Sequence, residues 1–186
     1  MKTLVLVAAL LVLPAPLNAQ NATDQMKNGQ PPTKASAATQ KFAKTAAITD
    51  MFEIQAGQLA QEKVQDQAYK DFAQMLVRDH TKTSNELKSM NIGVPLPQDL
   101  DSIHKAQIDK LNSLSGAAFE DQFKTGQVEG HKQAVAEFEQ YAKRGDNPQL
   151  KQWAQTTLPT LKTHVQHAEA LSQPASAPTV GSGKRR

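Results

Sequence analysis

The chain has 186 residues, no cysteine and a formal net charge of +3 at pH 7. The lack of cysteine excludes disulfides, thiolate chemistry and lipid attachment at a mature N-terminal cysteine. Part of the positive charge lies in the terminal Lys184-Arg185-Arg186, and the rest of the chain has no basic stripe and few aromatic residues. Nucleic-acid binding is therefore not expected.

The first 19 residues have the pattern of a secretory signal peptide. Lys2 supplies the positive start, Leu4 to Leu13 supply an apolar stretch, and small Ala19 precedes the expected cleavage point. The apolar stretch is much shorter than the about 20 residues that span a bilayer, and no later stretch reaches that length. We therefore expect an exported chain in the periplasm or at the outer membrane, with no transmembrane segment and at most peripheral attachment to the envelope.

Two polar segments flank the central part of the mature chain. Residues 20–38 are rich in Asn, Gln, Thr, Pro and Ala, and residues 173–186 are rich in Pro, Ser and Gly before a basic tip. Both compositions are typical of disorder. The domain is therefore expected at residues 39–172, where long amphipathic segments follow one another without strand-like alternation.

The first two predicted helices follow from apolar residues at steps of three and four. One covers residues 39–64. The next begins after Asp66, a suitable N-cap, and ends near Asn91. Because the turn between them is very short, they are expected to pack as antiparallel neighbours.

A loop and a short helix are predicted next. Gly93, Pro95 and Pro97 prevent a regular helix in residues 91–100, a segment long enough to cross one end of a bundle. A short helix is predicted at residues 102–114, before a pause at Ser115-Gly116.

The third and fourth long helices are predicted in the last part of the domain. The third ends near Arg144, and Asn147 and Pro148 are typical of the cap and first turn of the fourth, which runs to about Ser172. Pro159 lies inside this last helix and removes a backbone hydrogen bond, so a bend is expected there. The predicted fold class is all-α.

Each of the four long helices places one potential metal ligand in its apolar stripe: Glu53, His80, His131 and His164. Counted from the short turns at about 1.5 Å per residue, the members of each helix pair lie at similar depth. Burying these groups without partners would cost several kcal/mol. The sequence therefore predicts one polar cluster inside the bundle, whereas His104 and His167 fall outside the stripes and are expected at the surface.

The predicted cluster has two interpretations. Imidazoles and a carboxylate are suitable ligands for a single Zn, Fe, Mn or Cu ion, with Asp79 as a partner behind the ligands. Alternatively, the same residues form a metal-free polar network in a structural or interaction bundle of the envelope. No catalytic residues are predicted, because the sequence contains no G-x-S-x-G, H-E-x-x-H or P-loop pattern. A redox or hydrolytic metalloenzyme would also need an open coordination position.

Three glycines lie beside the predicted cluster. Gly57 is one helical turn from Glu53, and Gly126 and Gly130 precede His131. Each lowers helix propensity by about 1 kcal/mol. Close backbone approach or room for a ligand would explain them.

Several pieces of the domain resemble a known family: FEIQAGQLA, FAQMLVRDHTK, LSGAAFEDQF and QVEGHKQAVAEFEQYAKRGDNPQLKQWAQTTLPTLKTH. The family consists of exported bacterial proteins of uncharacterised function, often labelled as predicted outer-membrane proteins and grouped with the ferritin-like superfamily. The resemblance implies a ferritin-like antiparallel four-helix bundle with an extra short helix in the crossover between helices 2 and 3. It also implies that the Glu and three His residues match the family's polar motif.

The chain departs from the di-iron proteins of the ferritin-like class. Those proteins carry Glu-x-x-His motifs on two helices. The residues three positions before the three histidines are Val77, Val128 and Leu161. A carboxylate-bridged di-iron centre, with ferroxidase or oxygenase activity, is therefore not expected.

Overall fold

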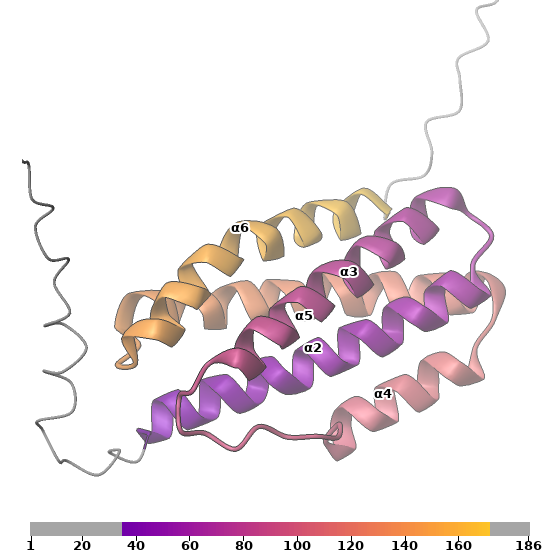
Figure 1. Cartoon of the computed structure of the whole chain (residues 1–186). Coiled ribbons are helices and arrows are strands. Elements are labelled where there is room, and N and C mark those ends of the chain that lie inside the picture. The colour runs from indigo at the N-terminus through magenta and orange to yellow at the C-terminus, as the bar shows by residue number, and fades with distance from the viewer. Residues whose placement is uncertain (1–34, 172–186) are drawn as a thin grey trace, which may run out of the picture. The chain divides into compact units, whose positions relative to one another are not determined.

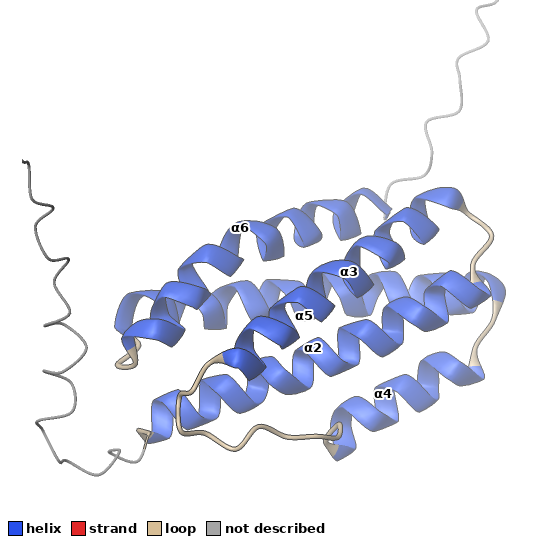
Figure 2. Cartoon of the chain, viewed as in Figure 1, coloured by secondary structure: helices blue, strands red, loops and turns tan. Residues whose placement is uncertain are grey.

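The computed structural model describes residues 35–171. The predicted signal peptide, nearly all of the predicted leader and the basic tail lie outside these residues. Within the described range, all regular structure is α-helical and no strand occurs (Figure 2). This confirms the all-α class. No helix in residues 35–171 is long and apolar enough to cross a membrane.

Five helices lie close to their predicted positions: α2 (Ala37–Lys63), α3 (Gln67–Ser89), α4 (Ser102–Ser113), α5 (Gly116–Arg144) and α6 (Pro148–Leu171). The main difference is at the start of α2. Ala37 and Ala38, predicted to belong to a disordered leader, are helical instead. Ser36 causes the earlier start, because its side chain accepts a hydrogen bond of 3.0 Å from the backbone N–H of Thr39 and so caps the helix.

The caps predicted at Asp66 and Asn147 are confirmed, and Asp101 caps the start of α4 in the same way. The side chains of Asp66, Asp101 and Asn147 accept hydrogen bonds from backbone N–H groups two or three residues further along the chain. Gly116 has a φ of 55°, in the left-handed region that favours glycine, and it separates α4 from α5. Pro159 lies inside α6, which continues without a break.

The four long helices form a bundle in which α2 packs on α3, α5 packs on α6, and the two pairs meet through α3 with α6 and α2 with α5. The shorter α4 lies outside, against α2 and α5. Figure 1 shows the loop after α3 and then α4 leading back along the bundle, so that α5 runs in the same direction as α3. Each contacting pair of long helices is therefore antiparallel.

Two apolar clusters fill the two ends of the bundle. One contains Phe42, Phe138 and Trp153, and the other contains Phe72 and Phe123. Between them lies a buried set of polar side chains, here called the polar layer: Asp50, Glu53, His80, Thr83, Gln127, His131 and His164. The apolar ends hold the helices together, and the layer between them contains the candidate site.

α2 approaches α3 closely at Gly57, near the polar layer. A Cβ atom at this position would lie 2.8 Å from Cγ2 of Val77 and 3.0 Å from the backbone oxygen of Ala73. A Cβ atom at Gly126 would meet nothing within 4 Å. Close backbone approach therefore explains Gly57, whereas Gly126 lies beside open space.

The two glycines are expected to respond in opposite ways to alanine. Gly57→Ala should lower the free energy of unfolding by about 1–3 kcal/mol, because the two backbones must separate. Gly126→Ala should raise it by about 0.5–1 kcal/mol through helix propensity alone. Urea unfolding followed by circular dichroism measures both changes. Equal stabilisation by the two substitutions would contradict the close approach.

Candidate metal centre

Three histidines from three helices meet in the polar layer. His80 on α3, His131 on α5 and His164 on α6 are each at most 2% exposed. Nε2 of His131 lies 3.4 Å from Nε2 of His80 and 3.1 Å from Nδ1 of His164. One nitrogen from each ring lies within 4.8 Å of the other two.

The outer nitrogen of each ring has its own partner. Nδ1 of His80 lies 2.8 Å from Oδ1 of Asp50. Nδ1 of His131 donates to the backbone oxygen of Gln127 at 3.0 Å, and Nε2 of His164 lies 3.1 Å from Oδ2 of Asp79. Partners of this kind set the orientation and tautomer of metal-binding histidines.

The protonation of two rings follows from these partners. A backbone carbonyl oxygen only accepts, so His131 carries its hydrogen on Nδ1 and has a lone pair on Nε2. The pKa of Asp79 is lowered overall: its partial burial acts to raise the value, but hydrogen bonds from Arg78 and His164 outweigh that effect. Asp79 is therefore ionised at neutral pH and accepts from Nε2–H of His164, which leaves a lone pair on Nδ1 of His164.

His80 and His164 are uncharged at neutral pH. Burial lowers the pKa of His80 to about 4, and the negative charge of Glu53 offsets only part of that effect. Burial and the neighbouring His80 and His131 lower the pKa of His164 to about 3, against the opposing effect of Asp79. Adding a proton to either of these two rings is therefore unfavourable at neutral pH.

Asp50 completes the group behind His80. The residue is 5% exposed, and its Oδ1 also accepts a hydrogen bond of 2.8 Å from Thr83 Oγ1. Burial raises the pKa of this carboxyl to about 8, although the bond from Thr83 acts in the opposite direction. A positive charge beside His80 would favour the ionised carboxylate.

The inward nitrogens suit a small cation. The lone pairs of His131 Nε2 and His164 Nδ1 face each other across 3.1 Å, with no proton of their own between them. A tetrahedral ion about 2.0–2.1 Å from each imidazole nitrogen would separate those nitrogens by about 3.3–3.4 Å. Two of the three separations, 3.1 and 3.4 Å, are close to that geometry, and the third is at most 4.8 Å.

Glu53 lies in the same layer but has a different partner. Its side chain is 3% exposed, and Oε2 accepts a hydrogen bond of 2.8 Å from Nε2 of Gln127. The three mutually close ligand atoms come from the histidines and do not include a Glu53 oxygen. Its role as a metal ligand stays a prediction.

The structure adds two residues to those predicted and places the other two histidines elsewhere. Asp50 and Gln127 were missed, although Asp50 lies three residues before Glu53 and Gln127 four before His131, which are same-face spacings. Exposed His167 packs on Phe72, and half-buried His104 bonds to Asp101. Neither belongs to the three-histidine group.

Comparison with known proteins gives the fold and the family. The chain is similar to a solved structure described as "Crystal structure of DUF305 fragment from Deinococcus radiodurans", with a TM-score of 0.65 and 16% identity over 75% of this chain and 98% of that one. At this identity the likeness shows the fold alone. No curated protein matches the chain. A family model described as "Domain of unknown function (DUF4142)" matches residues 24–171, and the chain belongs to that family.

Proposed function

We propose that this chain is an exported cell-envelope protein whose helical domain binds a single transition-metal ion through His80, His131 and His164. The observation that carries the proposal is the short distance between the lone pairs of His131 and His164. Two uncharged nitrogens that both present lone pairs repel each other, and a bound cation converts that repulsion into two coordinate bonds.

The ligand set favours particular metals. Three neutral imidazoles suit Zn, Cu or Fe better than Mn, which binds well to oxygen-rich sites. Three histidines leave a fourth position for Glu53 or water. The proposal concerns binding and assigns no reaction.

The arrangement of the helices supports a ferritin-like four-helix bundle as the finer description of the fold. The pairs α2–α3 and α5–α6 are each joined by a short turn, and a long crossover that contains α4 connects them (Figure 1). One long crossover is the connection found in ferritin-like bundles. Without Glu-x-x-His motifs, the domain would use this architecture for one ion held by histidines.

Export and attachment to the envelope are part of the same proposal. Their support is the charged start and short apolar stretch in the first 19 residues. Periplasmic protein that begins near Gln20 would support export, and retention of Met1 there would contradict cleavage.

The direct test is the metal content of protein purified from the periplasm without added metal. About one equivalent of Zn, Cu or Fe per chain is expected by mass spectrometry of the metal, and removal by a chelator should lower the melting temperature, because an ion bound only to the folded state stabilises it. Metal-free protein that takes up no ion and melts unchanged with chelator would instead support the structural network.

A further inference from the structure

A cleft between α2, α4 and α5 leads to the polar layer. Its volume is about 710 Å³, within the range of small-ligand sites. Glu53 and Gln127 line it, whereas the three histidines do not. These two residues therefore separate the cleft from the histidines.

Glu53 and Gln127 present oxygen atoms suited to a cation. Glu53 is a buried carboxylic side chain whose hydrogen-bond partner is the neutral amide of Gln127. Gln127 is 2% exposed, and its Oε1 atom is buried without a hydrogen-bond partner. A buried acceptor without a donor costs free energy, so this pair has an unused capacity to bind a positive group.

The same two residues are connected to the histidines. The backbone oxygen of Gln127 accepts a hydrogen bond from Nδ1 of His131, and the negative charge of Glu53 acts to raise the pKa of His80. An ion at the Glu53 and Gln127 oxygens would therefore be one hydrogen-bonded residue away from His131 and within electrostatic reach of His80.

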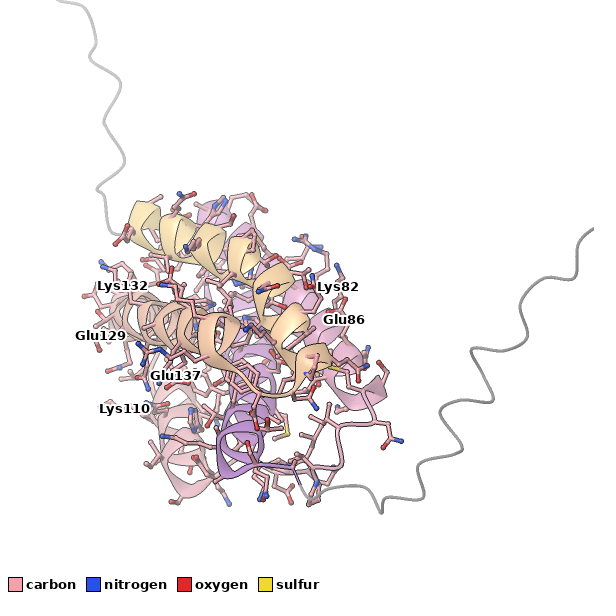
Figure 3. All side chains as sticks on the ribbon, turned by 90° about the vertical axis from the view of Figure 1, so that its left-hand side faces the viewer. Lys82, Glu86, Lys110, Glu129, Lys132 and Glu137 are labelled. Carbon is pink, nitrogen blue, oxygen red and sulfur yellow. The ribbon has the colours of Figure 1, made fainter. Side chains whose placement is uncertain are left out.

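The walls and rim of the cleft favour the approach of a cation. Cβ atoms at Gly126 and Gly130 would meet nothing within 4 Å, so α5 leaves an open wall there. Glu129, Glu137 and Lys110 line the cleft, and Figure 3 shows all three on the same side of the bundle. Together with Glu53, the lining contains three glutamates and one lysine. A cleft with an excess of negative charge attracts cations.

On the Asp79 side of the histidines, the partly exposed carboxylate is already paired with a positive group. Asp79 is partly exposed and bonds to His164, but the guanidinium of Arg78 donates to both Asp79 oxygens at 2.9 and 3.2 Å. A metal ion arriving there would meet a positive group. Charge therefore favours the cleft over this face.

We propose that the metal ion enters through the cleft between α2, α4 and α5, and that the Glu53 carboxylate and Gln127 Oε1 form a transient oxygen site through which it passes to the histidines. This inference rests on the proposed metal site. Glu53 then acts in the exchange of the ion, and the histidines hold it at equilibrium.

Stopped-flow absorbance with Co²⁺ on the metal-free full chain tests the route, because the visible spectrum of Co²⁺ changes when imidazoles replace water. Glu53→Gln and Gly130→Leu should each slow association at least about tenfold, and Gly130→Leu should slow dissociation by the same factor and so leave the equilibrium affinity nearly unchanged. Gly130→Leu fills the cleft at a point where the side chain has room, so it tests the route without altering the polar layer.

Two matched variants give the comparison. Ala136→Leu adds the same side chain at an exposed α5 position that does not line the cleft, and it should not change either rate. Arg78→Gln removes the positive group at the opposing face, and it should also leave association unchanged.

Three results would overturn the route. The first is wild-type rates in both cleft variants, and the second is faster association in Arg78→Gln. The third is faster dissociation with unchanged association in Glu53→Gln, which would make Glu53 a ligand of the bound ion. Failure of the wild-type protein to bind Co²⁺ at all is a different result: it would refute the three-histidine site, and the route with it.

Discussion

Replacing His131 with alanine is expected to abolish metal binding. Its Nε2 atom lies within 3.4 Å of the inward nitrogens of both other histidines, so the substitution leaves only two of the three imidazole ligands. The affinity should fall by more than the about 10–100-fold typical of residues that only orient ligands. Titration of the metal-free protein with Zn²⁺, followed by calorimetry, measures the loss.

Two further variants separate this effect from damage to the fold. His167→Ala changes an exposed histidine on α6 and should leave the affinity unchanged. His131→Gln keeps most of the buried volume, and it should retain helical content by circular dichroism while losing the metal. Wild-type affinity in either His131 variant would show that the three-histidine group does not hold the ion.

The helices were predictable because their signals are local. Apolar spacing at steps of three and four gave the four long helices, and the caps at Asp66 and Asn147 gave starts that agree with the structure. The burial of all three histidines followed from the same spacing, since each lies one or two turns from large apolar residues on the same face.

Asp50 shows the limit of that spacing. The predicted cluster did not include Asp50, although Asp50 is buried and its neighbour Thr49 is only half-buried. The physical reason is that α2 contacts α3, α4 and α5, so its buried face is wider than a single stripe. A position at the edge of one stripe is then central to the contact with another helix.

The partners of individual atoms were beyond prediction from sequence. The equal depths of the four predicted ligands indicated a shared layer, but depth does not determine whether Glu53 faces an imidazole or the amide of Gln127. That choice depends on side-chain rotamers in the packed core. The same holds for the tautomer of His131, which follows from a bond to a backbone oxygen four residues away.

Replacing Asp50 with asparagine is expected to weaken metal binding by about 10–100-fold without removing the site. The amide oxygen can take the place of Oδ1 and accept from Thr83 and His80, which keeps the ring oriented. The amide nitrogen then replaces Oδ2, which has no hydrogen-bond partner. Because a cation beside His80 favours the ionised carboxylate, the substitution removes the negative charge that Asp50 would carry in the metal-bound state, with little change of shape.

The charge matters because it raises the electron-donating strength of the imidazole on the side that faces the ion. Competition with a coloured chelator for Zn²⁺ measures the affinity, and Asp109→Asn on the exposed face of α4 is the matched control, which should bind like wild type. If Asp50 serves only to pack and orient His80, asparagine will also bind like wild type. A selective loss in the Asp50 variant would show that the buried carboxylate and His80 act together on a bound cation.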